Sequence, residues 1–185
     1  IDAARAAYDK LTDAQKKLVK NLKVLTDAEA EYERLKKAAE DEAAAKAVDN
    51  LIAAIGKVEF TDESKGKIDA ARAAYDKLTD AQKKLVKNLK VLTDAEAEYE
   101  RLKKAAEDEA AAKAVDNLIA AIGKVEFTDE SKGKIDAARA AYDKLTDAQK
   151  KLVKNLKVLT DAEAEYERLK KAAEDEAAAK AVDNL

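Results

Sequence analysis

Carboxylates are the side chains most able to do chemistry in this sequence, because its 185 residues include no histidine and no cysteine. They are densest at Glu40-Asp41-Glu42, a run that recurs at Glu107-Asp108-Glu109. Hard divalent cations need about six or more converging oxygens, whereas adjacent positions on a helix point apart. We therefore expect solvated helix surface and no metal site at both runs. Nothing in the pattern indicates a cleft in which an acidic pair would act as general acid and base.

The missing residue types exclude further classes of site. Without histidine and cysteine there is no Ser-His-Asp triad, no Cys-His nucleophile and no zinc site of the usual ligands. The four glycines are isolated and form no phosphate-binding loop. Lys16-Lys17 and Lys36-Lys37 are too short and too diluted by acids for nucleic acid, and no 18-residue apolar run spans a membrane. The sequence predicts no enzyme, no cofactor, no small-molecule substrate, no nucleic-acid partner and no membrane partner.

Tyrosine is the remaining side chain with which a surface protein would contact a partner. Every tyrosine lies on an apolar helical stripe, which favours a core position over an exposed contact. A core role is therefore predicted for Tyr8, Tyr32, Tyr75, Tyr99, Tyr142 and Tyr166.

The elements that hold these side chains come from an internal repeat. One segment begins at Ile1, Ile68 and Ile135 without substitution, so the period is 67 residues. The linking stretch at residues 52–67 recurs at residues 119–134. Such identity arises by recent duplication or in a synthetic gene. Charged residues make up 41% of the chain and proline is absent, which favours long helices and an all-α fold.

Each repeat begins with two predicted helices. Thr61 to Ser64 supplies capping hydroxyls and first-turn acids for a helix whose stripe is Ile68, Ala71, Tyr75 and Leu78. A short extra helix follows, with apolar residues Leu85, Val86, Leu89 and Leu92. The sequence predicts that a capping box opens this short helix at Thr12/Gln15, Thr79/Gln82 and Thr146/Gln149.

A long helix then follows in each repeat. A second capping box is predicted to open it at Thr26/Glu29, Thr93/Glu96 and Thr160/Glu163. No stop signal precedes Gly56 or Gly123, which suit the left-handed position after a helix, so the helix runs for about 29 residues, or about 43 Å. We expect Val125 and Phe127, in the connector that follows, to pack onto the bundle.

The two halves of the long helix carry different stripes. Ala95, Tyr99, Leu102 and Ala106 form the first, and Val115, Leu118, Ile119 and Ile122 form the second, about 180° away. One helix therefore serves two cores. Between the stripes lies EAAAK, a semi-rigid helical spacer whose Glu and Lys pair at i and i+4. It occurs at Glu42–Lys46, Glu109–Lys113 and Glu176–Lys180.

The repeat resembles the tandem three-helix repeats of Gram-positive bacterial cell-surface proteins. The resemblance is carried by LIxxIG, IxxARxAYDxLTxxQKxLVxN and LxxAExxY, at Leu51–Gly56, Ile68–Asn88 and Leu92–Tyr99, about 50 residues of each repeat. It implies three-helix bundles that project a domain from the cell wall, and an extracellular parent protein. The chain departs from the family at its continuous EAAAK junctions, which favours an engineered version. A synthetic chain carries no expected location.

These patterns predict tandem three-helix bundles that share long helices, comparable with a spectrin-like rod. The expected divisions are an incomplete first bundle without its first helix at residues 1–42, complete repeats at 43–109 and 110–176, and a stub of the next first helix at 177–185. The predicted function is a structural spacer or scaffold. Weak head-to-tail association of the incomplete ends is a further hypothesis, and a surface-adhesin stalk that binds a host protein is the alternative.

Overall fold

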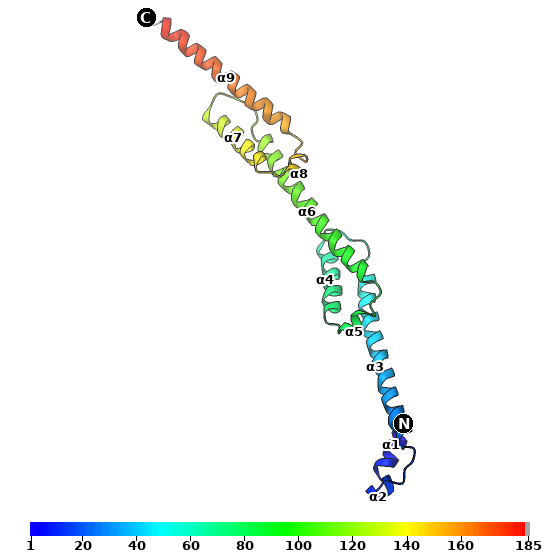
Figure 1. The fold of residues 1–185 in the computed structure, drawn as a ribbon. Coiled ribbons are helices and arrows are strands. Elements are labelled where there is room, and N and C mark those ends of the chain that lie inside the picture. Colours follow the sequence, from blue (N-terminus) through cyan, green and yellow to red (C-terminus); the bar gives the residue numbers. More distant parts are fainter. Residues whose placement is uncertain (184–185) are drawn as a thin grey trace. The chain divides into compact units, whose positions relative to one another are not determined.

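The computed structural model describes residues 1–183 and is all-α. No strand occurs in this range, and Figure 1 shows long helices alternating with short ones. The helices are α1 (Asp2–Asp9), α2 (Asp13–Lys16), α3 (Leu22–Ala53), α4 (Asp62–Asp76), α5 (Asp80–Lys83), α6 (Leu89–Ala120), α7 (Asp129–Asp143), α8 (Asp147–Lys150) and α9 (Leu156–Asp183).

The chain divides into two compact units, Ile1–Tyr99 and Glu100–Leu185. Each unit contains one buried apolar cluster, built from the end of a long helix, a middle-length helix and the start of the next long helix. Core 1 consists of Val48, Ile52, Ile55, Ile68, Ala71, Leu92, Ala95 and Tyr99. Core 2 consists of Val115, Ile119, Ile122, Ile135, Ala138, Leu159, Ala162 and Tyr166. The two clusters fall inside the predicted complete repeats 43–109 and 110–176.

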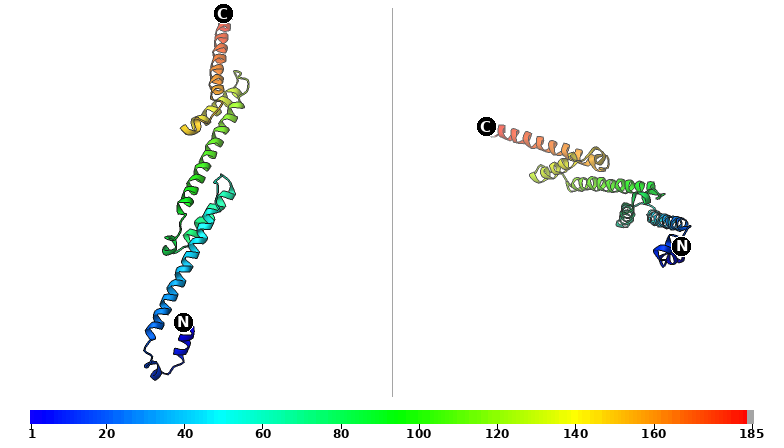
Figure 2. Two further views of the ribbon diagram at one scale, coloured as in Figure 1. Left: turned by 90° about the vertical axis from the view of Figure 1, so that its right-hand side faces the viewer. Right: turned by 60° about the horizontal axis from the view of Figure 1, so that its bottom comes forward.

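The long helix α6 belongs to both units, and Figure 2 shows it without a break in either view. Leu92, Ala95 and Tyr99 in its first part are buried in core 1. Val115 and Ile119 in its last part are buried in core 2. Part of each predicted stripe thus lies in a different cluster, whereas Leu102 and Ala106 of the first stripe are half-buried and belong to neither.

The long helix differs from its predicted bounds. It has 32 residues and begins at Leu89, ahead of Thr93. Leu89 and Leu92 therefore belong to α6, and the extra helix α5 is a single turn of four residues. Leu118, which was predicted to lie on the buried second stripe, is 40% exposed. Ala112, which was not part of that prediction, is buried. The reason is periodicity, because Ala112, Val115, Ile119 and Ile122 follow at spacings of three and four.

The middle helix α4 starts and packs as its sequence predicts. The Thr61 hydroxyl oxygen accepts the Ser64 backbone N–H at 3.2 Å, and Asp62 and Glu63 occupy the first turn. Ile68 and Ala71 are buried, and the partly buried Tyr75 and Leu78 pack against core 1. Leu78 lies two residues beyond the end of the helix.

The connector between long and middle helices contributes one aromatic contact per unit. Val125 packs on core 2, and the Phe127 ring lies 5.5 Å from the Tyr166 ring, centroid to centroid. Phe60 and Tyr99 repeat this contact in the first unit. Such tilted aromatic pairs add about 0.5–1.5 kcal/mol beyond the burial of their area.

Side chains in the first part of α3 and the last part of α9 are more exposed than their repeat counterparts in α6. Tyr32 is 56% exposed, whereas its repeat counterpart Tyr99 is 8% exposed, so the predicted core role of Tyr32 is wrong. The reason is that Tyr99 packs against Phe60, and no described residue supplies that ring to Tyr32. The predicted stub at 177–185 continues α9 to Asp183, and residues 184–185 lie outside the described part.

Candidate functional site

The candidate functional region is the set of polar contacts that fix where the shared helices begin and which helices they pack against. The first of these are the predicted capping boxes at the short helices. At α5 the Thr79 hydroxyl oxygen accepts the Gln82 N–H at 3.3 Å, and the Gln82 side-chain oxygen accepts the Thr79 N–H at 2.9 Å. The boxes at α2 and α8 have the same reciprocal bonds, formed by Thr12/Gln15 and Thr146/Gln149.

Gln82 also makes a contact that the sequence did not indicate. Its side-chain nitrogen donates to the Asp41 carboxylate at 2.8 Å, linking α5 to α3. Asp41 is only 8% exposed and forms an ion pair with Lys37 on its own helix. Gln149, Asp108 and Lys104 repeat the arrangement in the second unit.

The expectation that both acidic runs are solvated surface is therefore wrong at their central residues. A buried carboxylate needs polar partners. Each aspartate accepts a hydrogen bond from the glutamine of the short helix and pairs with a lysine of its own helix, as an ion pair at 3.4 Å for Asp41 and with hydrogen bonds for Asp108. Hydrogen bonds from Lys104 and then Gln149 hold the pKa of Asp108 below its ordinary value. The signal was present in the sequence, because Asp41 lies four residues before Ala45 and seven before Val48, on the stripe that continues into core 1.

The predicted second capping box is wrong in all three copies. Thr26, Thr93 and Thr160 lie inside the long helices, four residues after the first helical residue, and each donates its hydroxyl to a backbone carbonyl three residues earlier at 2.9–3.0 Å. This bond is the usual alternative for threonine within a helix. A threonine followed by glutamate three residues later is a local pattern, and in all three copies the glutamate instead pairs with an arginine on another helix.

The first distant residue is an aspartate that accepts backbone hydrogen bonds just ahead of α6 and α9, whereas α3 has no side-chain cap at the matching position. Asp49 accepts the backbone N–H groups of Lys87 at 3.0 Å and Asn88 at 2.9 Å, immediately before α6. Asp116 accepts those of Lys154 and Asn155 before α9. A carboxylate at a helix N-terminus satisfies otherwise unpaired donors and complements the helix dipole. Because α3 starts at the matching residue Leu22 without such an acceptor, Asp49 satisfies these donors but does not decide that α6 starts at Leu89.

The second distant residue is an arginine that engages the predicted capping glutamate. Arg72 on α4 donates from Nε and Nη2 to the two carboxylate oxygens of Glu96 on α6, both at 2.7 Å. Arg139 and Glu163 do the same in the second unit, and Arg5 and Glu29 pair on α1 and α3. The hydrogen bonds that Arg72 donates to Glu96 raise the pKa of Arg72 above its ordinary value. The arginine guanidinium also lies over Tyr75, 5.4 Å from the ring centroid.

The predicted turn glycines adopt the expected backbone. Gly56 has φ +65° and Gly123 has φ +64°, the left-handed conformation that ends a helix. Ile55 and Ile122, the residues just before them, are buried in core 1 and core 2. Each glycine thus turns the chain at the edge of its core.

The EAAAK segments are helical at all three positions, but their ion pairs differ. Glu176 and Lys180 form the predicted pair at 2.5 Å. Glu42 and Lys46 line a shallow surface pocket with Asp49, Leu85 and Lys87, and Glu109 and Lys113 line the matching pocket in the second unit. Within residues 1–183, neither of these two Glu/Lys pairs comes within ion-pair distance. The alanines between them carry the helix, with Ala45 and Ala112 buried.

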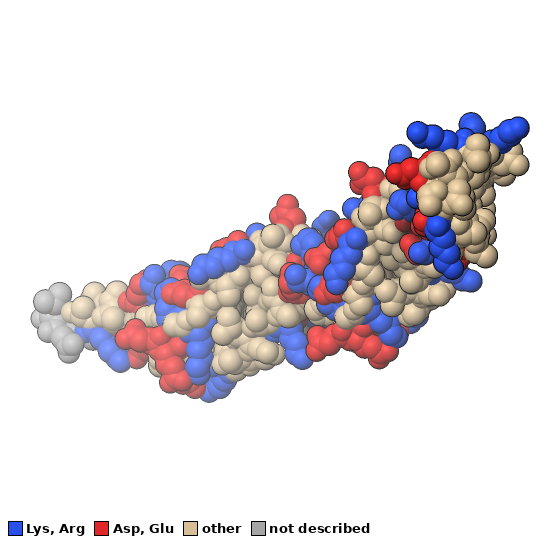
Figure 3. Space-filling model, turned by 90° about the horizontal axis from the view of Figure 1, so that it is seen from below, with Lys and Arg blue, Asp and Glu red and all other residues tan. Residues whose placement is uncertain are grey.

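The charged surface is mixed over the visible face, where Figure 3 shows Lys/Arg and Asp/Glu side chains interspersed. Within residues 1–183 no group of three or more acidic side chains is placed to hold a metal ion. None of the helices in that range has a long enough apolar stretch to cross a lipid bilayer.

Comparison with known proteins adds no relative to this picture. A scan against protein-family models gives no match, and searches of the curated proteins and of the solved structures find no similar chain.

Proposed function

We propose that this chain is a structural spacer, in which helical bundles joined by shared helices hold attached elements apart and resist bending. The observation that carries the proposal is α6, a helix of 32 residues that supplies buried side chains to core 1 and to core 2. A bend within α6 requires loss of backbone hydrogen bonds, and a bend at either end requires unpacking of a core.

The composition of the α6 segment between core 1 and core 2 also supports the spacer proposal. Residues 100–107 lie after Tyr99, the last residue of core 1, and before the buried Asp108 and Ala112 of the second unit. Lys103 pairs with Glu100 at 3.8 Å and Lys104 with Asp108 at 3.0 Å, both within the helix. Alanine, lysine and glutamate are strong helix formers, so the segment is expected to stay helical without tertiary cover.

We further propose that the repeats are of synthetic origin. The support is the identity of the copies over a 67-residue period and the EAAAK segment at each junction. A rod of identical repeats is lengthened by adding copies, because each repeat contacts only its neighbours.

The test compares two proline substitutions in identical local sequence. Ala105→Pro breaks α6 between the cores, where Ala105 is exposed, because proline removes one helix hydrogen bond and clashes with the preceding turn. Ala172→Pro makes the same change in α9, beyond core 2, where it disturbs neither core. Small-angle scattering at low concentration should show a shorter and more variable maximum dimension for Ala105→Pro alone.

Two controls accompany this comparison. In-line light scattering establishes that each sample is a monomer, and circular dichroism establishes that both variants keep their melting transitions. If Ala105→Pro and the parent chain had the same distance distribution, continuity of α6 would not determine stiffness and the spacer proposal would fail.

A further inference from the structure

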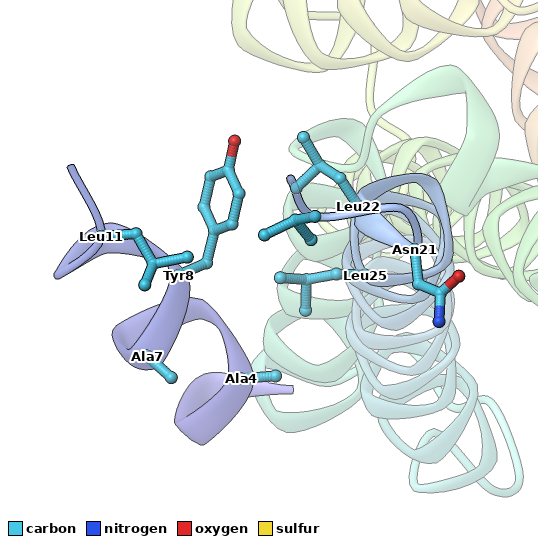
Figure 4. Close-up of a pocket in the computed structure, with 8 residues that line it drawn as sticks. Ala4, Ala7, Tyr8, Leu11, Asn21, Leu22 and Leu25 are labelled. Carbon is cyan, nitrogen blue, oxygen red and sulfur yellow. The ribbon is translucent and has the colours of Figure 1, made fainter. Parts of the chain in front are cut away.

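The first unit contains an open apolar groove between α1 and the start of α3. Its volume is about 390 Å³. In Figure 4, Tyr8 and Leu11 face Leu22 and Leu25 across the gap. The groove is lined by Ala4, Ala7, Tyr8, Leu11, Val19, Asn21, Leu22 and Leu25.

The repeat shows what fills such a groove, because the same residues occur in two further copies. Leu92 and Ala71, the counterparts of Leu25 and Ala4, are fully buried in core 1. They share that cluster with Val48 and Ile52 at the end of α3 and with Ile55 just beyond it. Core 2 has the same composition, so this surface is covered by the same helical sequence wherever that sequence precedes it.

The covering helix is recognised by polar contacts as well as by apolar ones. Asp41 accepts a hydrogen bond from Gln82, and Asp49 accepts two from the backbone of Lys87 and Asn88. The first unit presents the same donors at Gln15, Lys20 and Asn21. No residue among 1–183 is placed against these donors as Asp41 and Asp49 are placed against Gln82, Lys87 and Asn88, and α3 has no side-chain cap at Asn21.

The matching helix is present at the other end of the described chain. Asp175, Ala179 and Val182 on α9 are the repeat counterparts of Asp41, Ala45 and Val48. They are exposed, Val182 at 70%, and Asp175 pairs with Lys171 as Asp41 pairs with Lys37. Ala45 and Val48 are buried in the first unit, so the α9 residues carry a binding surface with no cover of its own.

We propose that the groove between α1 and α3 binds the C-terminal part of α9 from a second copy of this chain. Ala179 and Val182 of that copy enter the groove beside Tyr8 and Leu25, and Asp175 accepts a hydrogen bond from Gln15. The contact joins two different surfaces, so each added copy leaves one groove and one helix end open and the assembly grows without closing.

The contact is weaker than the one inside core 1. Asp175, Ala179 and Val182 match only part of the covering surface, because Ile52 and Ile55 are also buried in core 1. A helix that carries both isoleucines should therefore bind the groove at least about tenfold more tightly than α9 does.

The first experiment is sedimentation equilibrium of the 185-residue chain over a concentration series up to about 1 mM. The weight-average mass should rise with concentration beyond that of a dimer. Val182→Asp should raise the dissociation constant at least about tenfold, because it places a charge in the apolar groove. Val24→Asp is the matched control: Val24 is 69% exposed and does not line the groove, so its association should match that of the parent chain.

The second experiment supplies the complete covering helix as a labelled peptide of residues 40–56. Fluorescence anisotropy should show saturable binding of one peptide per chain, and the peptide should dissociate the assemblies. The same peptide with Val48→Asp should not bind. This probe leaves the chain unaltered, so a negative result cannot come from misfolding of a variant.

Three results would overturn the proposal: a constant monomer mass across the series, association that is unchanged in Val182→Asp, or a peptide that fails to compete. The spacer proposal is independent of these outcomes, because it is tested on the monomer at low concentration with Ala105→Pro.

Discussion

Arg72 and Glu96 are 24 residues apart in sequence and are joined by two parallel hydrogen bonds, each 2.7 Å long, that tie α4 to α6. Their side chains are about one-third exposed, so the pair is partly screened by solvent. Its geometry is nevertheless specific, because a guanidinium matches a carboxylate with two donors at once. The same pair recurs as Arg139 and Glu163.

Replacing this arginine with lysine should destabilise each unit although the charge is kept. We expect Arg72→Lys together with Arg139→Lys to lower the free energy of unfolding by about 0.5–1 kcal/mol per site, since lysine cannot form the paired bonds or stack on Tyr75 in the same way. Urea denaturation measures the change. Arg34→Lys is the control, because Arg34 makes the same two-bond contact with Glu31 on one exposed helix, and its loss should cost less.

Removing the aspartate ahead of α6 should cost more than removing an exposed one. Asp49→Ala leaves the N–H groups of Lys87 and Asn88 without their acceptor, and loss of such a cap typically costs about 0.5–2 kcal/mol. Asp94→Ala also removes a carboxylate near that end of α6, but Asp94 bonds only to Lys90. Equal midpoints of denaturation for the two variants would contradict the capping role.

The same glycine-to-alanine substitution should change the free energy of unfolding in opposite directions at two positions. Gly66→Ala lies within α4 and its Cβ meets open space, so it should stabilise the unit by about 0.5–1 kcal/mol. Gly56→Ala also meets open space, but the backbone there has φ +65°, so it should destabilise by about 1 kcal/mol. Thermal melts of the two variants should shift in opposite directions. A shared direction would mean that the backbone at Gly56 relaxes.

Helices and cores were predictable from the sequence because they follow local periodicity. The stripe of Ile68, Ala71 and Tyr75 and the turn at Gly56 need only the spacing of apolar residues and the special backbone of glycine. Contacts between helices were harder to predict from the sequence. Thr93 and Glu96 form a valid local capping pattern, and only packing shows that Glu96 pairs with Arg72 and that Asp49 accepts N–H groups ahead of the helix.

The burial of Asp41 could be predicted from the spacing of residues, but its hydrogen-bond partner could not. Its place on the apolar stripe is readable from the positions of Ala45 and Val48, but a carboxylate on such a stripe is stable only with a partner. That partner, Gln82, is 41 residues away and already serves a predicted capping box. The sequence predicted one role for Gln82, in the capping box, and the structure adds a second, the hydrogen bond to Asp41.

The aspartate of the second unit makes stability depend on pH with a defined sign. Hydrogen bonds from Lys104 and Gln149 lower the pKa of Asp108 in the folded chain, so the unfolded chain takes up this proton first as the pH falls. The stabilisation is therefore complete above the ordinary aspartate pKa of about 3.9 and is lost as the pH falls through the lowered folded value.

Asp108→Asn should flatten this dependence, because asparagine keeps a hydrogen-bond acceptor for Gln149 but has no proton to gain. Between about pH 6 and pH 3, the urea midpoint of the second unit should fall less in the variant than in the parent chain. Asp161→Asn removes a charge from the same unit at a residue that bonds only to Lys157 on its own helix, and it should leave the slope close to that of the parent. A slope for Asp108→Asn equal to that of Asp161→Asn would show that the bonds from Lys104 and Gln149 contribute nothing to acid sensitivity, and that other carboxylates paired within the unit, such as Glu130 with Lys134, carry it.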